Sequence, residues 1–64
     1  MEEILHTKRE LVIINKEPFA IRVDFFDKGM VRVSSIDHPE IFFKGMSKKQ
    51  AMMDVKRKII QKLF

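Results

Sequence analysis

The chain has 64 residues and a formal net charge of +4, with 13 lysines and arginines against 9 aspartates and glutamates. The absence of cysteine excludes disulfides and thiolate zinc sites. No apolar run approaches the roughly 20 residues of a membrane span. A domain of this size buries only about 60% of the surface of its unfolded chain, so we expect either tight packing or association with other subunits.

Residues 1–9 are charged and aperiodic, which predicts an N-terminal arm or a poorly defined edge element ahead of a single domain over residues 10–64. The acidic start differs from the basic start of a secretory signal. We therefore expect a cytoplasmic protein without membrane contact.

Glu10–Asn15 is rich in β-branched residues and predicts a strand. Lys16-Glu17-Pro18 interrupts it, and proline cannot donate to a ladder, so this segment is a turn or a break at a sheet edge. Phe19–Phe26 then alternates, and after the turn signal Asp27-Lys28-Gly29 the segment Met30–Ile36 alternates again. This pattern predicts an antiparallel hairpin. One face is apolar, with Phe19, Ile21, Val23, Phe25, Val31 and Val33, and the other carries Ala20, Arg22, Asp24, Arg32 and Ser34.

A loop over residues 37–40 leads to a short strand, Ile41–Lys44. Ser47 and Gln50 form the pattern of a capping box, in which the serine hydroxyl accepts from the Gln50 amide. We expect about four turns of helix from Lys48 to Leu63, since no proline or glycine intervenes. The predicted fold is α+β: a three-stranded antiparallel sheet (β-β-β-α) with one C-terminal helix packed on one face.

The predicted helix carries two apolar stripes. The first suffices to cover the sheet and comprises Ala51, Met52, Val55, Ile59 and Leu63. Met53, Ile60 and Phe64 form the second, which is either scattered exposure or a subunit interface rich in adaptable methionine. We favour the interface because the chain is small, and we expect a homo-oligomer.

The sequence offers little for catalysis. His6 and His38 are isolated, and no histidine pair or carboxylate cluster has the spacing of a metal site. His38 and Asp37 are neighbours on an extended segment, so their side chains point apart. We expect no enzyme, no metal and no cofactor. A hydrolase using His38 is the least favoured alternative.

The basic composition supports a second hypothesis, a small module that binds DNA or RNA. Its candidate phosphate contacts are Lys44, Lys48, Lys49, Arg57 and Lys58. Single-strand readers present aromatic side chains on a sheet. Phe26 and one of Phe42 and Phe43 are expected to point away from the core.

The segment from Asp37 to Ala51, DHPEIFFKGMSKKQA, has the spacing of a common run in small antitoxin-like domains: a D-x-P start, apolar residues, a glycine, and a threonine–acid–acid–alanine helix start. The matching positions are Asp37, Pro39, Gly45, Ser47, Gln50 and Ala51. Over about residues 19–63 the chain resembles the HicB-like superfamily. This resemblance implies a β-β-β-α layout and assembly as dimers or larger oligomers.

The chain departs from the family pattern at Glu40, where glycine is usual, and at Lys48 and Lys49, which replace an apolar residue and an acid. Complete HicB antitoxins also carry a C-terminal DNA-binding region, so we expect no operator-binding role here. The glycine–serine–histidine motif of the partner ribonuclease is absent as well. The sequence thus predicts a non-enzymatic, self-associating protein-interaction module, in the setting of an antitoxin-like or phage-type regulator that binds and inhibits a protein partner.

Overall fold

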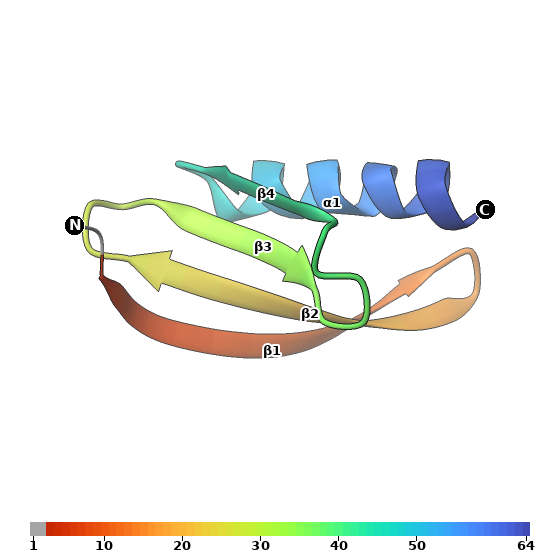
Figure 1. The fold of residues 1–64 in the computed structure, drawn as a ribbon, viewed down its shortest axis with the longest axis horizontal. Coiled ribbons are helices and arrows are strands. Elements are labelled where there is room, and N and C mark those ends of the chain that lie inside the picture. The colour runs from red at the N-terminus through yellow and green to blue at the C-terminus, as the bar shows by residue number, and fades with distance from the viewer. Residues whose placement is uncertain (1–2) are drawn as a thin grey trace.

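The computed structural model describes residues 3–64 as four strands followed by one helix (Figure 1). The elements are β1 (Ile4–Ile14), β2 (Glu17–Phe26), β3 (Val31–Ser35), β4 (Phe42–Gly45) and α1 (Lys48–Leu63). The strands form one antiparallel sheet in the order β1-β2-β3-β4, so each strand pairs with the next in sequence. The α+β class with a C-terminal helix on the sheet is confirmed. The predicted number of three strands is wrong, because there are four.

The additional strand is β1, whose second half was predicted as the strand Glu10–Asn15 but was not counted in the three-stranded sheet. Residues 4–9, expected as an arm or a poorly defined edge element, are the first half of the edge strand β1; residues 1–2 lie outside the described part of the chain. β1 pairs with β2 from Ile4 opposite Phe26 to Ile14 opposite Glu17, with an irregularity between Ile4 and His6. Strand pairing along this length overrides the charged, aperiodic composition of the N-terminal half.

Asn15 and Lys16 make the turn of this hairpin with φ values of 50° and 67°. Positive φ at both central residues is the signature of a type I′ turn, whose twist matches that of the flanking strands. The turn or break predicted over Lys16-Glu17-Pro18 is thus a two-residue turn over Asn15-Lys16, and Glu17 and Pro18 belong to β2. Pro18 lies within β2 opposite Ile13, at a point that the shorter β3 does not reach, so its missing N–H costs no ladder bond to β3.

The second hairpin has the predicted faces. Gly29 supplies the positive φ of its turn, at 77°. Ile21, Val23 and Val33 are fully buried on the side of the sheet that faces α1. The core between sheet and helix is one cluster, consisting of Ile14, Ile21, Val23, Val31, Val33, Ile41, Ala51, Val55 and Ile59.

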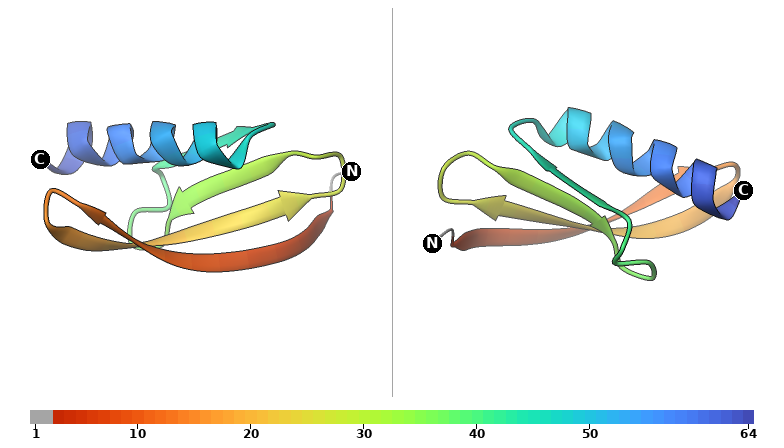
Figure 2. Two further views of the ribbon diagram at one scale, coloured as in Figure 1. Left: turned by 180° about the vertical axis from the view of Figure 1, so that it is seen from behind. Right: turned by 45° about the horizontal axis from the view of Figure 1, so that its top comes forward.

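Ser47 is the N-cap of α1, as predicted, and its hydroxyl accepts from the Gln50 amide at 3.3 Å. The helix lies over β3 and β4, and its C-terminal end approaches the β1–β2 turn, where the Phe64 ring meets the Phe19 ring edge-on at 6.0 Å (Figure 2). In residues 3–64 no helix is long and apolar enough to cross a membrane. The helix covers one side of the sheet, and the opposite side faces solvent (Figure 2).

Candidate functional site

The side of the sheet away from α1, which we call the open face, combines charged, polar and apolar side chains. Residues that are paired directly across neighbouring strands point to the same side of the sheet, so the strand register arranges side chains in two rows across the open face. One row is Thr7, Asp24, Arg32 and Lys44, and the next is Arg9, Arg22, Ser34 and Phe42. Further along β1, Leu11 and Ile13 are 70% and 65% exposed on the same side. The open face therefore has a cationic region beside an apolar one.

Asp24 organises the cationic region. Its carboxylate is fully buried beneath its neighbours and accepts four hydrogen bonds. Thr7 Oγ1 donates at 2.8 Å and Arg22 Nε at 2.9 Å, both to Oδ1, while Arg32 donates from Nε and a terminal nitrogen to Oδ2 at 3.2 and 2.9 Å. Burial raises the pKa of Asp24, but the hydrogen bonds from Thr7, Arg32 and Arg22 outweigh it, so the pKa lies below the usual range. Asp24 is thus held as a carboxylate.

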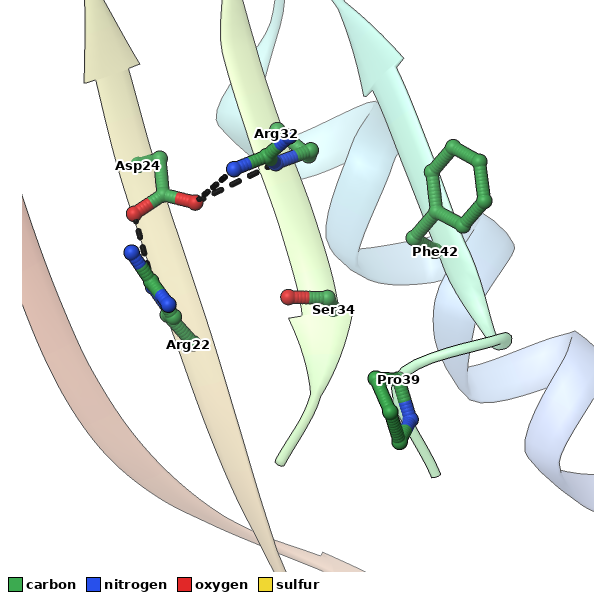
Figure 3. A pocket seen from close by; sticks show the side chains of 6 residues that line it. All are labelled: Arg22, Asp24, Arg32, Ser34, Pro39 and Phe42. Atoms are coloured by element: carbon green, nitrogen blue, oxygen red, sulfur yellow. Dashed lines mark hydrogen bonds and ion pairs between the residues drawn. The ribbon is translucent and has the colours of Figure 1, made fainter. Parts of the chain in front are cut away.

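The two arginine side chains lie on either side of this carboxylate and remain 46% and 37% exposed (Figure 3). They border a shallow hollow of about 260 Å³. Its lining residues are Arg22, Asp24, Arg32, Ser34, Pro39 and Phe42. A hollow with guanidinium and hydroxyl donors on one side and an aromatic ring on the other suits an anion attached to a planar group.

The phenylalanines of the open face differ in access. Phe26 is 8% exposed, and the side chains of Arg32 and Lys44 lie over its ring at 5.4 and 4.5 Å from the centroid. Phe42 is 50% exposed. Phe43 packs against the core on the helix side. The prediction that Phe26 and one of Phe42 and Phe43 point away from the core is confirmed, with Phe42 as the accessible ring.

The five cations proposed for nucleic-acid contact do not converge. Lys44 belongs to the open face, whereas the other four lie on α1. Arg57 and Lys58 both form ion pairs with Asp54, and Lys58 also donates to the Phe42 carbonyl oxygen at 3.0 Å. Lys49 is exposed.

Lys48 is also engaged within the fold, since its Nζ lies 2.6 Å from Glu10 Oε2. The hydrogen bond from Lys48 outweighs the effect of burial and lowers the pKa of Glu10. Lys48, Arg57 and Lys58 therefore tie α1 to itself and to the sheet.

The second apolar stripe of the helix is solvent-exposed. Met53, Ile60 and Phe64 are 63%, 43% and 51% exposed, although Phe64 also touches Phe19. By contrast Ala51, Val55 and Ile59 are fully buried. Leu63, placed in the core-facing arc by the sequence, is 38% exposed at the end of the helix.

A groove of about 610 Å³ runs beside this stripe, between α1 and β1. Its apolar lining is Val12, Met52 and Met53, and its rim is formed by Glu10, Lys48, Lys49 and Lys56. The groove exists because α1 sits over β3 and β4 and leaves the helix side of β1 partly uncovered. Methionine side chains beside it adapt readily to different surfaces.

The two histidines lie in separate parts of the fold. His6 stacks on Phe25 with ring centroids 5.9 Å apart, and His38 Nδ1 lies 3.8 Å from Glu40 Oε1 in the β3–β4 connection. Within residues 3–64, no three histidine, aspartate or glutamate side chains are grouped so that they could hold a metal ion.

Comparison of the chain with protein-family models, with curated proteins and with solved structures finds no match. The HicB-like resemblance therefore stays a prediction from the segment between Asp37 and Ala51.

The Asp24 cluster was not predicted, although the sequence contained its signal. Arg22 and Asp24 alternate on the polar face of β2, and the Gly29 turn fixes the register that puts Arg32 opposite Asp24. An acid between two arginines on one face is the pattern that would have revealed it.

Proposed function

We propose that this protein is a non-enzymatic, self-associating protein-interaction module. The observation that carries the proposal is the exposed stripe of Met53, Ile60 and Phe64 on a helix whose other side is fully packed. Apolar side chains at positions i, i+7 and i+11 lie along one line of a helix and present a continuous surface to a partner. Burying them in a second copy removes apolar area from water that this small fold cannot cover itself.

The charged residues beside the stripe predict how the self-association interface responds to salt. Lys49 and Lys56 flank the stripe, four residues before and three residues after Met53, whereas Arg57 is paired with Asp54. Two copies that meet through this side bring like charges together, which opposes association at low ionic strength. Self-association should therefore strengthen as salt is added, whereas binding of an acid-rimmed protein partner should weaken.

Sedimentation equilibrium over a concentration series tests the proposal. Wild type should associate, Ile60→Asp should be monomeric, and Gln61→Asp should behave as wild type because it adds the same charge at an exposed position beside the stripe. Circular dichroism checks that each variant is folded. A wild type that is monomeric at high micromolar concentration refutes the proposal.

The inhibitory regulatory role rests on the HicB-like resemblance alone. It predicts that a gene beside this one encodes a small basic protein with a glycine–serine–histidine motif. Co-expression of the two products should give a stable complex and suppress the toxicity of the second. Failure of the two proteins to co-purify removes this role and leaves the self-association proposal standing.

A further inference from the structure

The open face carries more positive charge than its own carboxylate neutralises. Among the described residues of this face, the guanidiniums of Arg22 and Arg32 share the carboxylate of Asp24, and Arg9 adds a third positive charge in the row of Arg22. Arg9 lies directly opposite Arg22 across the β1–β2 pair. Like charges at directly opposed positions destabilise a sheet, so a bound anion would relieve a repulsion that is built into this face.

The arginines also keep hydrogen-bond donors in reserve. Each guanidinium has five N–H donors. Arg22 gives Asp24 only its Nε–H, so the donors on both terminal nitrogens remain, and within residues 3–64 they have no acceptor. The buried Asp24 carboxylate holds both guanidiniums in place, Arg22 on Oδ1 and Arg32 on Oδ2 (Figure 3). The donors are therefore oriented before any ligand arrives, which lowers the entropic cost of binding.

An exposed ring lies in the same row as the charges. Phe42 follows Arg9, Arg22 and Ser34 across the sheet, and it borders the hollow that Arg22 and Arg32 also line. Four neighbouring strands span about 14 Å from the first to the last. Guanidiniums at one end of the row and an aromatic face at the other match a ligand that alternates phosphates with planar bases.

We propose that the open face binds single-stranded nucleic acid, with phosphates on Arg9, Arg22 and Arg32 and a base stacked on Phe42. Unpaired bases are required, because a base within a duplex cannot reach a ring that lies on a sheet. This surface is on the opposite side of the sheet from the helix stripe. Nucleic-acid binding and self-association are therefore independent properties of the fold.

Fluorescence anisotropy with a labelled oligothymidylate of about 16 nucleotides at low salt tests the proposal. Contacts to two or three phosphates predict that log K falls with log salt with a slope of about −1.4 to −2.1. Phe42→Leu keeps the apolar volume but removes the aromatic face, and it should weaken binding about 5- to 150-fold. Arg9→Gln should weaken binding and reduce the salt slope by about 0.7.

The matched control is Lys49→Gln, which removes one positive charge from α1 on the far side of the sheet. Arg9 forms no ion pair within residues 3–64, and Lys49 is exposed, so neither change removes an ion pair of the described fold. Ile60→Asp should bind like wild type. The proposal is overturned if the oligonucleotide does not bind, if Lys49→Gln and Arg9→Gln weaken binding equally, or if a duplex or polyglutamate binds as tightly as the single strand.

Discussion

Replacing Asp24 with asparagine tests whether the buried carboxylate holds the open face together. The amide is nearly isosteric, but it retains only one acceptor oxygen. With that oxygen placed to keep both bonds from Arg32, the amide nitrogen faces Arg22 Nε and loses that bond, while the Thr7 hydroxyl can turn to accept. Asp24→Asn thus removes one charged hydrogen bond and weakens two others.

Hydrogen bonds that involve a charged group contribute about 1.5–3 kcal/mol each. Because Arg22 and Arg32 are partly exposed, water replaces some of what they lose. We therefore expect the free energy of unfolding to fall by about 2 kcal/mol. A 64-residue domain has roughly 3–10 kcal/mol in total, so the variant should still fold.

Urea unfolding followed by circular dichroism measures the change. With a slope of about 1 kcal/mol/M for a small domain, the midpoint at pH 7 should fall by about 2 M. The exposed Asp37 provides the control, since Asp37→Asn removes the same charge and should change stability by less than about 0.5 kcal/mol.

The difference between wild type and Asp24→Asn should depend on pH. The folded-state pKa of Asp24 lies below its unfolded value of about 3.9, so the carboxylate stabilises the fold above that value. This contribution is lost as pH falls through the folded pKa, and the two midpoints should converge in acid. Equal midpoints at pH 7, or a gap that persists unchanged in acid, would refute the reasoning.

Three further changes probe the turns and the link between helix and sheet. Lys16→Gly should raise stability by about 0.5–1 kcal/mol in urea unfolding, because Lys16 has a φ of 67°; a loss of stability would contradict the type I′ turn. Gly45→Ala should lower the melting temperature, since its Cβ would lie 2.9 Å from Cε1 of the core-packed Phe43, and an unchanged melting curve would show that the ring moves at no cost. Glu10→Gln should cost less than about 1 kcal/mol, and that cost should shrink in high salt because the Lys48 partner is 40% exposed; a salt-independent loss would indicate packing instead.

Much of the fold could be predicted from local chemistry. The Gly29 turn, the alternation of the second hairpin and the Ser47 cap are each decided by a few adjacent residues, and all three are present as expected. Residues 4–9 could not be placed in this way. Their strand conformation comes from pairing with β2, and the turn that aligns the two strands uses Asn15-Lys16 without the usual glycine.

The candidate sites were predictable to different degrees. The exposure of Met53 and Ile60 follows from helical periodicity, because the spacing of residues within one helix decides which of them share a side. The positions of Arg9, Arg22 and Arg32 on one face depend on the register of three strands, and the residue pattern predicts that register only for β2 and β3. The net charge of +4 indicates a basic protein but does not show which face of the fold carries the positive charge.

Because every strand lies beside its sequence neighbour, the chain never has to bring distant segments together to build the sheet. Each step closes a short loop, and such local topologies reach the native state quickly. Only α1 must then settle on β3 and β4, which it follows almost directly. We therefore expect rapid, single-exponential refolding in which the hairpins form before the helix docks.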